Sequence, residues 1–334
     1  MVNPEKTVAT PVDGAAAERR GKRMSADMSL DVRYYRLSEE LQADFTALYM
    51  FDMACGQGCL FEDYLHPEWA AMRFSCGTPP AAAIGPGPLE PQWPFVVSGP
   101  TSKAIHFSLT TARIWGLGLQ PGGWARFVDA EARDFTDRTV DGANEPAFAL
   151  FAPILPLTQD PARAPDKVAE DINAYLMGHA GRVEPRLEQV QALHAALRDP
   201  EVAHVSELEQ RLGLGMRSLE RICARYFGFP PKLLLRRQRF LRSLARYMLA
   251  PHGNWSDAID DRYYDQAQFV RDFRSFMGMT PSEYADHPHP VLSRIMAQRM
   301  ADQGAAGETD LPTMLRYGGM PAGADLASGN ALSE

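Results

Sequence analysis

Two stretches of the sequence set arginine and glutamine side chains opposite an apolar stripe at helical spacing. In residues 216–227 the stripe consists of Leu219, Ile222, Cys223, Tyr226 and Phe227. The residues that this leaves outward are Arg217, Arg221, Ala224 and, on the flank, Glu220. An arginine can form two hydrogen bonds with guanine, and a glutamine can form two with adenine. The outward face could therefore read base edges.

The second stretch, YYDQAQFVRDFRSFMGMTPSEY at residues 263–284, repeats this arrangement with aromatic residues. Its stripe consists of Phe269, Phe273, Phe276 and Met277. Its outward residues are Gln266, Ala267, Gln268, Arg271 and Arg274. We interpret the aromatic side chains as the packing of the unit and the opposite face as the part that meets DNA.

Each stretch is the second helix of a similar unit. The first unit reads VSELEQRLGLGMRSLERICARYFGFPP and the second reads WSDAIDDRYYDQAQFVRDFRSFMGMTP, each with a short helix, a tight turn, a longer helix and then a Gly followed by a Pro. Between them, PPKLLLRRQRFLRSLARYMLA predicts one helix from Pro231 of about 18 residues, or about 27 Å. Two units at that separation could enter neighbouring major-groove segments, which recur about every 34 Å.

Charge is unevenly divided between the two units. From Arg211 to Arg246 ten Lys or Arg residues face one acid, Glu220, a balance of +9. From Tyr247 to His289 three Arg residues face seven acids, a balance of -4. We expect the first unit and the connecting helix to supply most of the attraction to phosphate, and the second unit to add selectivity.

Residues 200–288 resemble the DNA-binding domain of the AraC/XylS family of bacterial transcription regulators. The hallmark of that family is an aromatic-rich second recognition helix followed by Gly-x-Thr-Pro-x-x-Tyr, matched here by Gly278, Thr280, Pro281 and Tyr284. RLGLGMRSLERI, Gly228, Pro231 and LRRQRF match its first unit. The resemblance implies a double helix-turn-helix regulator that binds promoter or operator DNA and contacts RNA polymerase.

The resemblance also assigns roles to single residues. It implies that Arg217, Glu220 and Arg221 of the first unit contact DNA, and that Asp265 caps the second recognition helix. From the second unit it implies contacts by Gln266, Ala267, Gln268 and Arg271. The residues Arg225, Arg236 and Arg274 complete the set that we expect to bind DNA. Arg262 stands where the family favours glycine, and a non-glycine residue at positive φ costs about 1 kcal/mol, so we expect that turn to be slightly rebuilt.

The sequence predicts an α+β fold in which a β-rich part precedes the helical units. Short apolar runs broken by Gly and Pro predict a barrel or sandwich at residues 28–160, and GLGLQPGGWARF predicts a strand that ends at Leu119, a turn at PGG and a helix near Trp124. We expect a helical linker at 161–199, the double helix-turn-helix domain at 200–289 and a flexible tail at 290–334. We expect residues 1–27 to form a disordered arm, which contains a basic run at Arg19 to Arg23. Through FVVSGPTSKAIHFSL, ARIWGLGLQPGGWARF and DFTDRTVDG the β-rich part resembles an uncharacterised domain of bacterial regulators, which implies a sensory or dimerisation role.

Composition and charge limit the remaining classes of protein. The 334 residues have 45% hydrophobic content and a net charge of -8, and without a signal peptide or an apolar span we expect a cytoplasmic protein that binds no membrane. In a reducing compartment the cysteines, Cys55, Cys59, Cys76 and Cys223, should stay thiols. We expect no cofactor, and the sequence leaves open a homodimer and a small-molecule effector.

Two alternatives compete with the DNA-binding hypothesis. An enzyme is disfavoured because GLGLQPGG lacks the Lys-Ser/Thr of a phosphate loop, and His66, His106 and the cysteines lack the spacing of metal ligands. We expect His287 and His289 to be exposed to solvent. The second alternative is a regulator that acts mainly by protein contact, with a weakened second DNA-binding unit.

Overall fold

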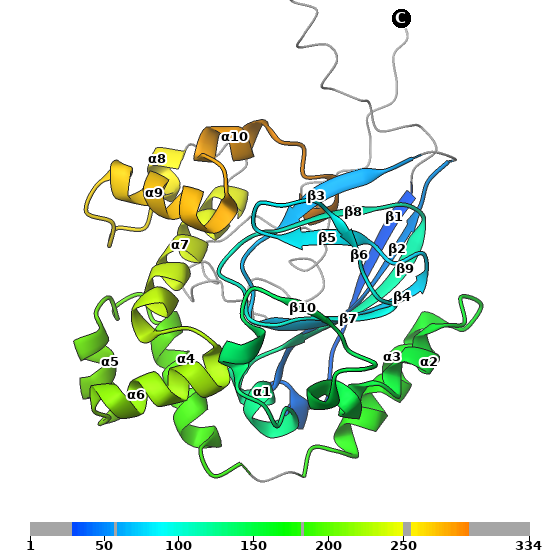
Figure 1. The fold of residues 1–334 in the computed structure, drawn as a ribbon, viewed down its shortest axis with the longest axis horizontal. Helices are drawn as coiled ribbons and strands as arrows, with labels where there is room; N and C mark the ends of the chain where they lie inside the picture. The colour runs from blue at the N-terminus through cyan, green and yellow to red at the C-terminus, as the bar shows by residue number, and fades with distance from the viewer. Residues whose placement is uncertain (1–28, 57–58, 182–183, 250–254, 294–334) are drawn as a thin grey trace, which may run out of the picture.

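The first part of the chain is a pair of antiparallel sheets. The computed structural model describes residues 29–56, 59–181, 184–249 and 255–293. One sheet has six strands in the order β1-β2-β9-β4-β7-β10, and the other has four in the order β3-β8-β5-β6 (Figure 1). The strands are β1 Ser29–Tyr35, β2 Phe45–Ala54, β3 Phe61–Leu65, β4 Ala70–Gly77, β5 Ala81–Ile84, β6 Glu90–Pro91, β7 Phe95–Ser98, β8 Ile105–Leu109, β9 Ala112–Leu119 and β10 Thr139–Asp141. The predicted β-rich region and the α+β class are confirmed.

A close approach between β2 and β9 explains a glycine in the middle of the larger sheet. Tyr49 pairs with Gly116, and a Cβ atom at Gly116 would lie 2.0 Å from the Tyr49 ring. The missing side chain lets this ring lie across β9, and Tyr49 also lines the cavity between the sheets. Gly116 therefore leaves the space that the ring of a cavity-lining residue occupies.

The helix after β9 begins earlier than the sequence predicts. The strand ends at Leu119 as expected, but α1 spans Pro121–Phe127, so PGG is the first helical turn and not the turn before it. Proline fits this position because N–H groups in the first turn of a helix have no acceptor within the helix, so the N–H that Pro121 lacks would make no helical hydrogen bond. The buried Trp124 ring donates from Nε1 to the Ala130 carbonyl at 2.9 Å and fixes the helix end.

The remaining helices surround one end and one side of the sheets. They are α2 Ile154–Thr158, α3 Pro165–Met177, α4 Leu187–Arg198, α5 Val205–Leu212, α6 Met216–Ile222, α7 Pro231–Leu249, α8 Trp255–Ala258, α9 Gln266–Met277 and α10 Pro281–Asp286. In Figure 1, α5 and α6 lie at one end of α7, and α8, α9 and α10 lie at the other. The helix predicted from Pro231 is confirmed and has 19 residues.

One hydrophobic cluster runs from the larger sheet into the first helical unit. It includes Trp115 of β9, Ile172 of α3, Leu193 of α4 and Phe227 after α6, all of them buried. A smaller cluster around Phe240 and Phe273 holds the second unit together and includes Ala104 from the β-rich part. The helical units are therefore packed against the sheets, and α3 and α4 form part of the same core.

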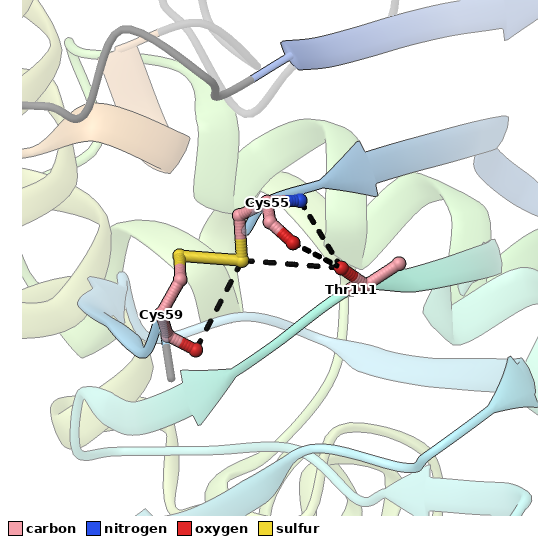
Figure 2. The surroundings of a disulfide bond; sticks show 3 residues. All are labelled: Cys55, Cys59 and Thr111. Atoms are coloured by element: carbon pink, nitrogen blue, oxygen red, sulfur yellow. Dashed lines mark hydrogen bonds between the residues drawn. A yellow bond between two sulfur atoms is a disulfide. The ribbon is translucent and has the colours of Figure 1, made fainter. Parts of the chain in front are cut away.

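The expectation that all four cysteines are thiols is wrong. Cys55, at the end of β2, and Cys59 form a disulfide, as Figure 2 shows. Thr111 Oγ1 lies 3.1 Å from both the backbone nitrogen and the carbonyl oxygen of Cys55. Cys76 and Cys223 are free, and burial raises the pKa of the Cys223 thiol to about 12, so Cys223 packs as a small apolar residue. The basic run at Arg19 to Arg23 and the tail after Ser293 lie outside the described residues.

Candidate nucleic-acid interface

The first helix-turn-helix unit is α5, a glycine turn and α6. Gly213 ends α5 at φ 63°, a left-handed conformation that favours glycine, and α6 continues as a π-helical turn, Cys223–Phe227. The predicted apolar stripe is buried in full. The side chains of Arg217, Glu220 and Arg221 are exposed on the opposite face. These three predicted residues lie together on one helix and are available to a partner.

The second unit is α8, a turn and α9, and α9 begins at the cap that the sequence predicts. Asp265 Oδ1 accepts from the Gln268 backbone N–H at 2.6 Å, which confirms the cap. Gly278 ends α9 at φ 74°, and Thr280 caps α10 by accepting from the Glu283 N–H at 3.2 Å. The Gly-x-Thr-Pro pattern is thus a helix end followed by a helix start.

The outward face of α9 carries most of the residues that the sequence predicts to contact DNA. Its stripe of Phe269, Phe273, Phe276 and Met277 is buried, whereas Gln266, Ala267, Arg271 and Arg274 are exposed. Gln268 is half-buried, and its Oε1 accepts from the Tyr264 backbone N–H at 3.0 Å. The Gln268 carbonyl is thereby engaged in the turn, which leaves its amide NH₂ group as the part that can reach a base.

Two of the predicted residues are engaged with other side chains of the protein. Arg225 lies over the Tyr226 ring at 5.5 Å and 3.9 Å from the Asp129 carboxylate. Arg236, in α7, pairs with the buried Asp272 at 2.6 Å. Their role in DNA binding remains a prediction, and the contacts reduce what each side chain can offer a phosphate.

Most basic residues of α7 are less exposed than their number suggests. Lys232 is exposed, whereas the arginines of α7 are half-buried or buried. Arg239 lies 3.3 Å from Asp272, and Arg242 bonds Asp260 at 2.6 Å with both side chains buried. Three arginines of this helix thus pair with acids of the second unit, which reduces the charge that the helix can offer to phosphate, and its attraction to phosphate stays a prediction.

The same pairs change the electrostatic description of the second unit. Asp260 and Asp272 account for two of its acids, and both are buried beside arginines, so neither repels a phosphate at the surface. The turn at Arg262 is built without the left-handed conformation that glycine favours: of the described non-glycine residues, Asp137 has a positive φ and Arg262 does not. The Arg262 N–H bonds Asp260 Oδ1 at 3.0 Å and stabilises the turn without glycine.

The second unit is attached to the β-rich part by a series of hydrogen bonds. The Ala104 N–H donates to the Phe276 carbonyl at the end of α9 at 2.7 Å, and Lys103 Nζ donates to the Ser275 carbonyl. His66 Nε2 lies 2.8 Å from the Tyr284 hydroxyl of α10. These bonds restrict the second unit to one orientation on the sheets.

The segment after α10 continues this attachment. His289 Nδ1 lies 2.9 Å from the buried carboxylate of Asp63, whose second oxygen accepts from the backbone N–H groups of Val291 and Leu292 at 3.0 and 2.8 Å. The expected solvent exposure is found for His287 and is wrong for His289. Asp63 could not be found from the sequence, because its partners in this segment are more than 220 residues away.

Among the described residues there is no group of three or more His, Cys, Asp or Glu side chains placed to hold a metal ion. Within the same part of the chain no helix is long and apolar enough to cross a membrane.

The helical units match a known protein domain. Residues 208–287 match the family described as "Helix-turn-helix domain". This is an AraC-type domain, and the match supports DNA-binding transcription regulation as the function of the chain. No curated protein sequence matches the chain.

Several solved structures are similar over most of the chain. ToxT from Vibrio cholerae has 10% identity, covers 77% of this chain and 97% of its own, and gives a TM-score of 0.39. Wild-type ToxT from Vibrio cholerae with bound unsaturated fatty acid has 10% identity over 79% of this chain and 96% of its own, with a TM-score of 0.36. The AraC-like transcriptional activator CuxR has 13% identity over 65% and 87%, with a TM-score of 0.25. At these TM-scores the likeness carries no conclusion about ligands or partners.

Proposed function

We propose that the protein is a sequence-specific transcription regulator that reads two adjacent major-groove segments with α6 and α9. The observation that carries the proposal is that each helix buries an apolar stripe and exposes a polar face of arginine, glutamine or glutamate. Residues of these types at the surface of a helix can bond base edges and phosphates. A single chain with two such helices would bind as a helix-turn-helix dimer does.

The two units contribute more equally than the charge count suggests. Arg217 and Arg221 are exposed on the first unit, and Arg271 and Arg274 are exposed on the second. The acids that outnumber arginines after Tyr247 include two that are neutralised by α7. Each unit therefore offers a pair of arginines to the DNA, and each is expected to add to both affinity and the dependence on salt.

The β-rich part acts as a modulator of the helical units. This role of the β-rich part is supported by the attachment of the second unit to Ala104, His66 and Asp63, because these contacts make the orientation of α9 depend on the sheets. The β-rich part could bind a small-molecule effector or a second copy of the chain. The regulator would then act on transcription through contact with RNA polymerase.

The proposal is tested by selection of bound sequences from genomic fragments, followed by fluorescence anisotropy on the selected site. We expect two half-sites about one helical turn apart and an affinity that falls steeply as salt rises. Equal affinity for the selected site and for random DNA would contradict sequence-specific reading. Binding without any dependence on salt would favour a regulator that acts by protein contact.

A further inference from the structure

The disulfide between Cys55 and Cys59 lies at a corner where the chain crosses from one sheet to the other. Cys55 follows the end of β2 in the larger sheet, and Cys59 precedes β3 in the smaller one. The crossing from β8 to β9 passes through Thr111, whose hydroxyl accepts from the Cys55 N–H and donates to the Cys55 carbonyl, each at 3.1 Å (Figure 2). These hydrogen bonds hold the end of β2 without the disulfide. The disulfide is the bond that ties this end to the chain entering β3.

The position of this disulfide suits a reversible bond better than a permanent support. The two cysteines are four residues apart, and closing so short a loop removes little entropy from the unfolded chain. Both cysteines are half-buried beside the exposed Ala54, Gly56 and Leu60, so a thiol or a peroxide can reach the sulfur atoms. A transcription regulator works in a compartment whose thiols keep most cysteines reduced, and disulfides that form there are usually transient or redox-sensing.

Strand β3 leads from the disulfide to the second helix-turn-helix unit. It is an edge strand of the smaller sheet, and it pairs with β8. Asp63, the fourth residue after Cys59, lies at the centre of β3 with its side chain buried. The Asp63 carboxylate accepts from the N–H groups of Val291 and Leu292 at 3.0 and 2.8 Å, and it lies 2.9 Å from His289 Nδ1. These three partners follow α10, so the position of β3 determines how the end of the second unit is held.

A hydrophobic cluster joins the same corner to the same segment. Val291 belongs to one buried cluster with Met53 and Ala112, which face each other in the pairing of β2 with β9. Met53 precedes Cys55 by two residues, and Ala112 directly follows Thr111. A change at the corner can therefore reach the segment after α10 through β3 and through this cluster.

We propose that Cys55 and Cys59 form a redox modification site, opened by a dithiol and closed by a peroxide, whose state sets how firmly β3 holds the second unit. The effect on DNA rests on the proposed function. In the oxidised protein the disulfide fixes the start of β3 and keeps Asp63 in place for residues 289–292. Reduction frees the start of this edge strand, so the segment and α10 loosen and α9 loses its fixed orientation. The oxidised protein binds DNA more tightly, because less freedom is lost when an ordered unit binds.

The two reactions balance without a metal or a further cofactor. In reduction, a thiolate of the dithiol attacks one cysteine sulfur, the S–S bond breaks, and the other cysteine leaves as a thiolate that takes a proton. The second thiol of the reductant then attacks the mixed disulfide, frees the remaining cysteine and ends as a cyclic disulfide, oxidised by two electrons. In oxidation, one cysteine thiolate attacks a peroxide oxygen, the O–O bond breaks, and a sulfenic acid and a hydroxide form. The second thiolate attacks the sulfenic sulfur and releases another hydroxide, so that two thiols and one peroxide give one disulfide and two waters.

The redox site is tested on the full chain without denaturant. The protein is treated with millimolar dithiothreitol or with hydrogen peroxide, its thiols are alkylated, and the peptides are identified by mass spectrometry. We expect alkylation of Cys55 and Cys59 after the dithiol, and a peptide mass that shows their disulfide after the peroxide. A pair that the dithiol does not open, or that the peroxide converts to sulfinic or sulfonic acid instead of the disulfide, would overturn the reversible site.

The link to the second unit is tested by hydrogen exchange of the oxidised and the reduced wild-type protein. Exchange in residues 61–65 and 281–292 should be faster in the reduced protein. The double variant Cys55→Ser, Cys59→Ser should exchange like reduced wild-type protein under both conditions. Cys76→Ser is the matched control, because Cys76 is a free half-buried cysteine of β4, and this variant should keep the full response. If reduction alters exchange in β2 and β3 alone and leaves 281–292 unchanged, the link is overturned.

The effect on function is measured as affinity for a selected operator in the two redox states. We expect reduction to weaken binding by about fivefold or more in wild-type protein and in Cys76→Ser. Asp63→Asn keeps the size of the side chain and removes its charge, so its affinity should be low and equal in both states. Equal affinity of oxidised and reduced wild-type protein would overturn the coupling to DNA binding. If neither state binds a specific sequence, the proposed function fails, whereas alkylation and hydrogen exchange still decide whether the redox site and its link exist.

Discussion

Asp272 of α9 and Arg236 of α7 form an ion pair at 2.6 Å, in which the aspartate side chain is only 5% exposed. Arg239 lies 3.3 Å from the other carboxylate oxygen. The arginines that looked like a phosphate-binding surface therefore hold the recognition helix of the second unit against the connecting helix. Arg236 and Arg239 thus position α9, whereas the exposed residues of α9 are the ones that we expect to contact DNA.

Removal of the buried carboxylate should destabilise the second unit. Asp272→Ala leaves two arginines without their acid, and because Arg236 is 37% exposed and can be hydrated, the loss in free energy of unfolding should fall below the roughly 3 to 5 kcal/mol of a fully buried pair. Urea denaturation of the full chain measures the loss. Asp286→Ala, at an exposed position on α10, is the control and should change the free energy of unfolding little. A midpoint for Asp272→Ala equal to that of the control would refute the structural role.

The exposed arginines of α6 should behave in the opposite way. Arg217→Ala or Arg221→Ala should weaken operator binding by about 1 to 3 kcal/mol and leave the melting temperature unchanged, because neither side chain packs in the core. Anisotropy and thermal melting measure the two effects. Arg133→Ala, an exposed arginine of the β-rich part, is the control. If the variants melt and bind the operator like the parent protein, α6 does not contact the DNA through these arginines.

The outward face of α9 should determine sequence preference at one half-site. Combined substitution of Gln266, Gln268 and Arg271 by alanine removes the groups that can bond base edges. We expect relaxed preference over a few base pairs of that half-site, and a salt slope lower by about one unit from the single arginine lost. Binding to a panel of operators with single base changes measures the preference. An unchanged panel would indicate that α9 contacts only the backbone of the DNA.

The contact between the β-rich part and α10 should depend on pH through His66. Burial lowers the pKa of His66 to about 3, with His289 lowering it further and Asp63 raising it. An unfolded histidine has a pKa of about 6.5, so between these values the unfolded state binds more protons. Stability is therefore present above about pH 6.5 and is lost as the pH falls toward 3.

The measurement is the difference in melting temperature between wild-type protein and His66→Gln at pH 7 and pH 5. The glutamine variant cannot take up the proton and should lose less stability on acidification. Equal losses in the two proteins would show that His66 does not carry the effect.

The sequence by itself determined the elements of the helical units. Their apolar stripes repeat every three or four residues, and the ends are fixed by residues that act within one turn, such as Asp265, Gly278 and Thr280. Short apolar runs broken by Gly and Pro likewise predicted the β-rich part. These signals are local, so they can be read without knowledge of the partners.

The tertiary structure alone decided which polar residues remain available. Arg236 and Asp272 are 36 residues apart, and His289 and Asp63 are 226 apart, so neither pair leaves a periodic pattern in the sequence. The sequence does not distinguish the arginines of α6 from those of α7. Arg217 and Arg221 of α6 are exposed, whereas Arg236, Arg239 and Arg242 of α7 pair with buried acids. The cost of leaving a charge buried without a partner makes such pairing obligatory, and only the packing of helices on sheets determines where it occurs.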